Sequence, residues 1–175
     1  YSIAKAGFSS FPQSDGGKLC QDLISGIELP ILNISHRMGW STKHQPIQIS
    51  SRNVSHVHFR LIEMSIEEHM GARTREIEEF PDILSRAPTF EWSSMISDTS
   101  NVRDLKSIIY PPKPVSPGFY LLVVSGNADF TQQDNLLIAS QIMVSDLNII
   151  VLPESIKGEA SGIVISSLTG DPISD

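Results

Sequence analysis

Pro117-Gly118-Phe119-Tyr120-Leu121-Leu122-Val123-Val124-Ser125 decides the fold, because it is an apolar run that opens on a Pro-Gly turn. Downstream, Gln141-Ile142-Met143-Val144-Ser145-Asp146-Leu147 is an apolar run that ends at Ser-Asp-Leu, and Gly162–Ile173 ends in a Thr-Gly-Asp-Pro turn. Short apolar runs bounded by turn residues are typical of strands buried in a sheet. Their order along the chain predicts a mainly β fold, an antiparallel sandwich.

The strongest strand predictions are Gly118–Ser125 and Leu136–Ser145, which flank the polar turn Gly126–Asp129. Two such strands joined by a hairpin turn are expected to pair as antiparallel neighbours at the centre of one sheet. Upstream, Ser55–Ile62 alternates polar and apolar residues, and its apolar residues fall on one face. This alternation predicts a strand packed on one side and solvated on the other. Further strands are predicted at Ile31–Ser35, Pro46–Ser50, Asp104–Tyr110, Asn148–Val151 and Gly162–Leu168, with another extended segment beginning at Phe90–Trp92.

Two segments have a helical pattern instead. Tyr1–Leu29 predicts a helical hairpin around the breaker-rich turn Phe11–Gly17. Its second helix, Lys18–Ile27, carries an amphipathic stripe made of Leu19, Cys20, Leu23, Ile24 and Ile27. The other segment, Glu67–Ala87, predicts a charged loop followed by a short helix near Phe80, with Pro81 in its first turn.

The predicted domains are therefore a helical hairpin over residues 1–29, a sandwich over 30–146 and the first strands of a following domain over 147–175. Because the chain begins at Tyr1 rather than Met, we interpret it as a fragment of a longer protein. An export signal would then lie upstream.

Composition excludes several classes of protein. The chain has 175 residues, of which 40% are hydrophobic and 19% charged, and this balance is typical of a folded domain. The formal net charge of −7 disfavours general binding to nucleic acid or anionic membranes, since no basic surplus would neutralise phosphate. No apolar run reaches the roughly 18–20 residues that span a bilayer. A single cysteine, Cys20, permits neither an intrachain disulfide nor a cysteine-rich zinc site.

His56 and His58 are the first candidates for chemistry, because their alternation places both side chains on one face of a strand. A metal site there would need a third ligand from His36, His44 or Glu63. The alternation with Val57 and Phe59 already explains both histidines as residues on the polar side of a half-buried strand. We adopt this structural interpretation.

The remaining candidates also have structural interpretations. Cys20 lies in the apolar stripe of a helix, where a buried packing cysteine is expected rather than a nucleophile. Five glutamates form an acidic stretch that we interpret as a solvated surface, namely Glu67, Glu68, Glu76, Glu78 and Glu79. Asp129, Asp134 and Asn135 could bind Ca²⁺, but their spacing does not match an EF-hand loop. The sequence predicts no catalytic, cofactor-binding or metal-binding residue, so we expect neither an enzyme nor a cofactor.

Several motifs, taken in their order along the chain, resemble the N-terminal macroglobulin region of bacterial (Bacteroidetes-type) alpha-2-macroglobulin-like proteins. The helical opening resembles the segment before their first macroglobulin domain, and Val144-Ser145-Asp146-Leu147 resembles their recurring domain junction. The other residues that carry the resemblance are Pro12, Ser14, Gly16-Gly17, Cys20, Leu23, Arg52-Asn53-Val54, His58–Ile62, Pro117–Leu121 and Val164–Ile173. Most of the chain outside Glu67–Asp98 takes part.

This resemblance implies an antiparallel fibronectin-like (macroglobulin) β-sandwich with a short N-terminal helical hairpin and one inserted short helix. It further implies a non-catalytic structural module of a large protein that traps proteases as an endopeptidase inhibitor. The implied partners are neighbouring domains of the same parent chain and a target protease. The implied location is extracytoplasmic, in the periplasm or anchored to the outer membrane through an upstream lipoprotein signal. Cys20 is followed by Gln21-Asp22, so the thioester motif of the family is absent from this chain.

Two other functions stay open at this point. Gly162–Ile173 also resembles the opening of carboxypeptidase-regulatory-like domains in nutrient-uptake receptors, which implies a carbohydrate- or protein-binding β-sandwich module of a bacterial cell-surface or nutrient-uptake system. An exposed aromatic platform would favour that function. The third alternative is a metal-assisted hydrolase built around His56 and His58.

Overall fold

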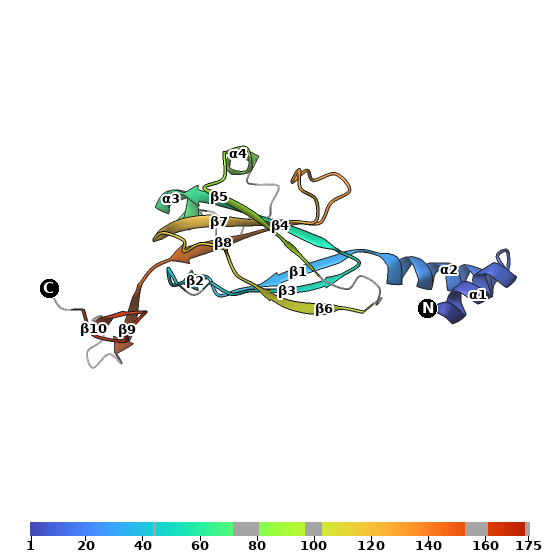
Figure 1. Ribbon diagram of the computed structural model, residues 1–175, viewed down its shortest axis with the longest axis horizontal. Coiled ribbons are helices and arrows are strands. Elements are labelled where there is room, and N and C mark those ends of the chain that lie inside the picture. Colours follow the sequence, from blue (N-terminus) through green and yellow to red (C-terminus); the bar gives the residue numbers. More distant parts are fainter. Residues whose placement is uncertain (44, 72–80, 97–102, 153–160, 174–175) are drawn as a thin grey trace.

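The computed structural model describes residues 1–43, 45–71, 81–96, 103–152 and 161–173. Two helices open the chain, strands of a sandwich follow, and a separate β-hairpin ends it (Figure 1). The elements are α1 Ser2–Ser10, α2 Asp15–Glu28, β1 Ile31–Ser35, β2 Gly39–Trp40, β3 Ile47–Arg52, β4 His56–Met64, α3 Ile66–Gly71, α4 Pro81–Leu84, β5 Phe90–Met95, β6 Leu105–Ile109, β7 Gly118–Ser125, β8 Leu137–Val144, β9 Leu147–Leu152 and β10 Ser161–Ser166.

The strands form a sandwich of a five-stranded and a three-stranded sheet. The larger sheet has the order β2-β8-β7-β4-β5 and the smaller the order β1-β3-β6. Every pairing is antiparallel except that of β2 with β8, which is parallel. The mainly β sandwich is therefore confirmed, with β7 at the centre of its larger sheet and β8 as the hairpin neighbour of β7.

The first strand of the sandwich is divided between the two sheets. β1 pairs with β3 in the small sheet, and after three connecting residues β2 pairs with Met143 and Val144 of β8 in the large sheet. Backbone hydrogen bonds run from Met143 to Met38 and from Ser145 to Trp40, both at 2.8 Å. This short stretch of chain therefore ties the two sheets to each other.

The core between the sheets comes from the alternating faces that the sequence predicts. Val57, Phe59 and Leu61 of β4 are fully buried, and they pack with Leu122 and Val124 of β7. Opposite them lie apolar residues of the small sheet, such as Ile47 and Ile49 of β3. Fully burying each such side chain is favourable by about 1.5–3 kcal/mol, so this core is the main stabilising feature of the fold.

The outer face of β4 is not simply solvated, which corrects the sequence prediction. His56 is exposed, but Ile62 and Met64 on the same face are buried. They pack with Leu121 and Val123 of β7 and with Ile83 of α4 in a second apolar cluster. The segment between β4 and β5 therefore supplies a third layer that covers this end of the large sheet (Figure 1).

The inserted segment also differs in its helices from the sequence prediction. Glu67 and Glu68 lie in a helix, α3, and not in a loop, so the insertion contains two described helices and not one. The predicted helix near Phe80 is α4, which begins at Pro81. Phe80, Glu76, Glu78 and Glu79 lie outside the described residues.

At the N-terminus α1 and α2 form the predicted hairpin, but its apolar stripe is only partly covered. Cys20, Ile24 and Ile27 are half-buried, whereas Leu19 and Leu23 are exposed. Close packing occurs at Gly17, where a Cβ atom would lie 1.8 Å from the carbonyl oxygen of Phe11. Only glycine fits there, so this contact sets the distance between the turn and α2.

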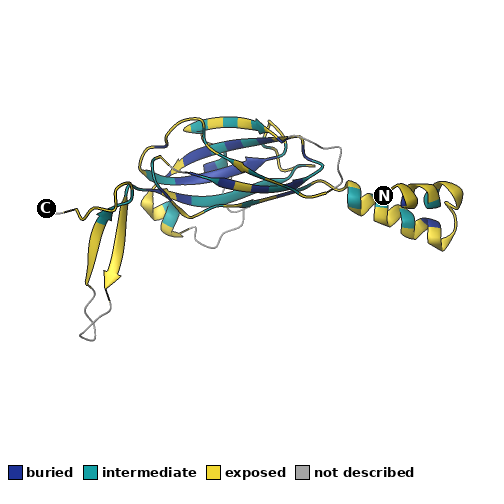
Figure 2. Ribbon diagram, turned by 60° about the horizontal axis from the view of Figure 1, so that its bottom comes forward, coloured by how far each residue is buried: buried dark blue, intermediate teal, exposed yellow. Residues whose placement is uncertain are grey.

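The hairpins at the two ends of the sandwich are largely exposed (Figure 2). Every residue of β9 is exposed, including the apolar side chains of Ile149 and Val151. The helical hairpin and the β9–β10 hairpin project from opposite ends of the sandwich, which makes the molecule elongated (Figures 1 and 2). Among the helices of the described part of the chain, none is both long enough and apolar enough to span a bilayer.

Candidate functional site

The candidate site is the junction at which the chain leaves the sandwich and enters β9. Ser145 separates Asp146 from the end of β8, and Ser41 separates Thr42 from the end of β2. The backbone N–H of Thr42 donates to Asp146 Oδ1 at 2.8 Å, and the Thr42 hydroxyl lies 2.8 and 2.7 Å from the two carboxylate oxygens. These contacts hold the pKa of Asp146 below its ordinary value, chiefly through the backbone N–H of Thr42 and then through its hydroxyl. We call this pair the Asp146–Thr42 clamp.

Neighbouring residues join the clamp to the C-terminal hairpin. The backbone N–H of Leu147 donates to Ser145 Oγ at 3.1 Å, and that of Ser167 donates to the carbonyl oxygen of Asp146 at 2.7 Å. The Val144-Ser145-Asp146-Leu147 run, read from the sequence as a domain junction, thus fixes how β9 leaves β8. Its serine and aspartate have separate tasks, since Ser145 turns the chain and Asp146 binds back to the sandwich.

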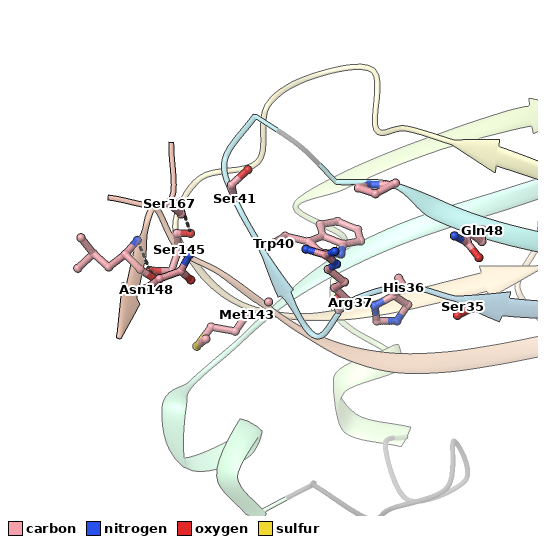
Figure 3. Close-up of a pocket in the computed structure, with 13 residues that line it drawn as sticks. Ser35, His36, Arg37, Trp40, Ser41, Gln48, Met143, Ser145, Asn148 and Ser167 are labelled. Carbon is pink, nitrogen blue, oxygen red and sulfur yellow. Dashed lines mark hydrogen bonds between the residues drawn. The ribbon is translucent and has the colours of Figure 1, made fainter. Parts of the chain in front are cut away.

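A cavity of about 600 Å³ lies at this junction (Figure 3). Its walls come from the sandwich and from the start and end of the C-terminal hairpin. His36 packs edge-on against Trp40, with ring centroids 5.9 Å apart, and the His36 Nδ1 atom lies 2.8 Å from the carbonyl oxygen of Arg37. Because a carbonyl can only accept, Nδ1 must carry the proton in this contact. The full lining is Ser35, His36, Arg37, Gly39, Trp40, Ser41, Pro46, Gln48, Met143, Ser145, Leu147, Asn148 and Ser167.

A second junction holds the helical hairpin to the other end of the sandwich. Asn53 has a φ of 56°, in the left-handed region, and its Nδ2 donates to the carbonyl oxygen of Ile27 at 2.7 Å. Arg52 donates to the carbonyl oxygen of Gly26 at 3.3 Å and lies 3.8 Å from Asp104. These side chains satisfy carbonyls in the last turn of α2, which have no partner within the helix.

The histidines considered as metal ligands are not brought together. His56 begins β4 and contacts Ser55, whereas His58 packs against Phe130 with ring centroids 6.4 Å apart. His58 pairs with Ser125 at the end of β7, while His36 lies beside Trp40, which pairs with Val144 opposite the start of β7. Within the described residues no group of three or more possible ligands could hold a metal ion. His44 lies outside those residues.

The acidic candidates serve helix structure where they are described. Glu68 Oε2 accepts from the backbone N–H of Ser65 at 2.8 Å, and Ser65 Oγ accepts from the N–H of Glu68 at 3.1 Å. This reciprocal pair is a capping box. Glu68 also binds Arg86, which follows α4, and this contact is the largest cause of the lowered pKa of Glu68. The Ser65-x-x-Glu68 spacing was the available sequence signal for α3, and the sequence prediction missed it.

The other candidates also have local structural contacts. Cys20 is half-buried and packs on α1, since a Cβ atom on Gly7 would lie 2.9 Å from its sulfur. Asp129 accepts from the backbone N–H and hydroxyl of Thr131, at 3.2 and 3.1 Å. Asn135 donates to Ser125 Oγ and to the Thr131 carbonyl, at 2.8 and 2.7 Å. Asp134 has a left-handed φ of 51° in the same loop. These contacts shape the loop between β7 and β8.

Comparison with solved structures finds the same fold in bacterial alpha-2-macroglobulin. The crystal structure of native alpha-2-macroglobulin from Escherichia coli spanning domains NIE-MG1 matches with a TM-score of 0.57 and 13% identity, covering 83% of this chain and 74% of that one. A structure of the same protein spanning domains MG0-NIE-MG1 matches with a TM-score of 0.55 and 12% identity, covering 82% of this chain and 47% of that one. No family model matches. No curated protein matches either. The chain thus resembles N-terminal alpha-2-macroglobulin domains in its fold.

Proposed function

We propose that this chain is a non-catalytic structural module of a large alpha-2-macroglobulin-like protein that traps proteases. The observation that supports it most is the likeness of fold to the NIE-MG1 region of the Escherichia coli protein over 83% of the chain. That solved structure comes from Escherichia coli, so a Bacteroidetes-type origin stays a prediction of the sequence. The extracytoplasmic location is part of the same proposal.

The exposed hairpins support neighbouring domains as partners. A two-stranded hairpin is at best marginally stable alone in water, yet β9–β10 exposes Ile149, Val151 and Ile163. An apolar surface of this kind is expected to be covered in the working protein. We therefore propose the division into residues 1–29, 30–146 and 147–175, in which the last segment opens a following domain. The Asp146–Thr42 clamp would then set the angle between the two domains.

A carbohydrate-binding platform has no comparable support. Trp92 stacks between Phe59 and Phe90, with ring centroids 4.7 and 5.2 Å away, and Trp40 is 2% exposed. The exposed large aromatic residues among those described are Tyr1, Phe11 and Tyr110, which lie before α1, after α1 and after β6. Two of them stand at opposite ends of one helix and the third follows a strand of the sandwich, so we retain the structural function.

The first experiment is to sequence the parent reading frame on both sides of this chain. A lipoprotein signal upstream and a very long downstream region would support the proposal, whereas continuation into a membrane barrel would contradict it. The second is to incubate the full-length parent with an endopeptidase and follow cleavage of a protein substrate. We expect cleavage to fall as the parent is added, and undiminished cleavage across a panel of endopeptidases would overturn the trapping function.

A further inference from the structure

The cavity beside the Asp146–Thr42 clamp is lined by basic and not by acidic side chains, although the chain is acidic overall. The formal net charge is −7, yet the thirteen lining residues include Arg37 and His36 and no aspartate or glutamate. Within the described part of the chain, Arg37 is exposed and forms no ion pair. Its guanidinium is therefore available to an anionic group from outside.

The carboxylate of Asp146, which stands between the lining residues Ser145 and Leu147 in the sequence, does not neutralise Arg37. Asp146 precedes the lining residue Leu147, but both of its oxygens contact Thr42. The hydrogen bonds from Thr42 lower the pKa of Asp146 most, and burial opposes them. The charged side chain that also lowers this pKa is Lys43, not Arg37. The only carboxylate of the Val144–Leu147 run is thus bound to Thr42. Arg37 stays available to a carboxylate from another molecule.

The rest of the lining suits a polypeptide segment. Gln48 and Asn148 are exposed side-chain amides, which can both donate to and accept from a peptide backbone. Met143, which is 42% exposed, supplies apolar surface beside them, and Trp40 lines the cavity as a buried side chain. In Figure 3, His36, Arg37 and Trp40 lie on the sandwich side of the cavity, and Ser145, Asn148 and Ser167 lie toward the C-terminal hairpin. A volume of about 600 Å³ is in the range of ligand sites.

We propose that this cavity binds an acidic peptide segment, with a glutamate or aspartate carboxylate on Arg37 and the flanking backbone on Gln48 and Asn148. The carboxylate forms a charge-assisted, bidentate pair with the guanidinium, as arginine favours. An occupant contacts both the sandwich and β9, so binding also fixes the angle between them. This site does not depend on the proposed trapping function, since it follows from the residues of the cavity alone.

The test is a titration of the ¹⁵N-labelled 175-residue chain, followed by the backbone amide signal of Asn148 and the indole N–H signal of Trp40. The probe is the capped peptide acetyl-Gly-Glu-Leu-Glu-Gly-amide, and its control is the same peptide with both glutamates replaced by glutamine. Glutarate and inorganic phosphate are titrated separately to distinguish a peptide from a free dicarboxylate or another anion. We expect saturable shifts at both signals with the glutamate peptide and affinity lower by about tenfold or more for the glutamine peptide.

Arg37→Gln is expected to lower the affinity for the glutamate peptide by about tenfold or more, and Arg37→Lys by less. The matched control is Arg103→Gln, which removes an exposed arginine just before β6. The cavity residue Gln48 pairs with Ile108 near the end of β6, so Arg103 lies at the other end of that strand. Equal losses in Arg37→Gln and Arg103→Gln would reduce the effect to overall charge and overturn the site. Equal binding of the glutamine peptide, or tighter binding of glutarate or phosphate than of the glutamate peptide, would overturn the acidic-peptide assignment.

Discussion

Two side chains, Asp146 and Asn53, determine how the chain enters and leaves the sandwich. Asp146 binds Thr42, which is 104 positions away in the sequence, and Asn53 binds the last turn of α2. Each forms a hydrogen bond to a backbone atom of another segment, so its role is structural. The consequences of both can be measured on the isolated chain.

We expect Asp146→Asn to destabilise the chain near neutral pH and to remove part of its acid sensitivity. The folded-state pKa of Asp146 lies below its ordinary value of 3.8 because of Thr42. The ionised carboxylate therefore stabilises the fold above the unfolded pKa, and this contribution is lost as the pH falls through the folded pKa. Thermal unfolding of both proteins between about pH 6 and pH 2 should give curves that differ at the upper end and converge at the lower end.

Asp22→Asn is the control for this experiment, because Asp22 is an exposed carboxylate on α2, away from the clamp. It should follow the unmodified chain at every pH. If Asp146→Asn does so as well, the clamp makes no contribution to stability.

For Asn53, two substitutions separate backbone strain from hydrogen bonding. Asn53→Ala should cost about 1–3 kcal/mol, since it loses the bond to Ile27 and places a Cβ-bearing residue without a polar side chain at a φ of 56°. Asn53→Gly removes the same bond but fits that φ freely, so it should cost less. Urea unfolding measures both, and a glycine variant that is less stable than the alanine variant would contradict this account.

At the scale of elements, alternation in the sequence was enough to predict β4, and an apolar run bounded by turn residues was enough to predict β7. Val57, Phe59 and Leu61 of β4 are fully buried on one face, as expected, whereas β7 buries apolar residues on both of its faces, among them Leu121 and Leu122. The burial of Ile62 and Met64 could not be predicted in the same way. It depends on α4, which packs on the outer face of the sheet through tertiary contacts that the pattern of one strand does not contain.

Ile83→Ala tests whether α4 stabilises the large sheet. Ile83 is 7% exposed within the outer cluster, and truncation of a buried isoleucine costs about 2–5 kcal/mol. The control is Ile66→Ala on α3, where the side chain is 54% exposed and the cost should be about 0.5 kcal/mol or less. Chemical unfolding that gives the same small change for both variants would mean that α4 is not part of the cooperative fold.

At the scale of the whole molecule, the sequence predicted the sandwich and the helical hairpin but not the contacts that orient them. The Asp146–Thr42 clamp joins residues far apart in the sequence, and only the parallel pairing of β2 with β8 brings them together. Local patterns carry no information about such a pairing. The candidate site could therefore be found as a motif, but its geometry and its cavity could not.

The exposed β9–β10 hairpin leads to a prediction about association. Replacing both Ile149 and Val151 by lysine should reduce self-association in sedimentation experiments, since both side chains are about 70% exposed. The free energy of unfolding of the sandwich should change by about 1 kcal/mol or less. Asn148→Lys adds one positive charge instead of two and removes no apolar side chain, so it should leave association closer to that of the unmodified chain. A large loss of sandwich stability in the double variant would show that the hairpin packs on it.

The division of the first strand between two sheets also determines how this molecule would carry a mechanical load. Because the two hairpins project from opposite ends of the sandwich, tension applied through them pulls β2 and β8 along their common axis (Figure 1). The bonds from Met143 to Met38, from Ser145 to Trp40 and from Thr42 to Asp146 are then loaded together in shear and not opened one at a time. We therefore expect these backbone bonds, together with the Asp146 carboxylate, to resist the separation of β2 from β8 under tension.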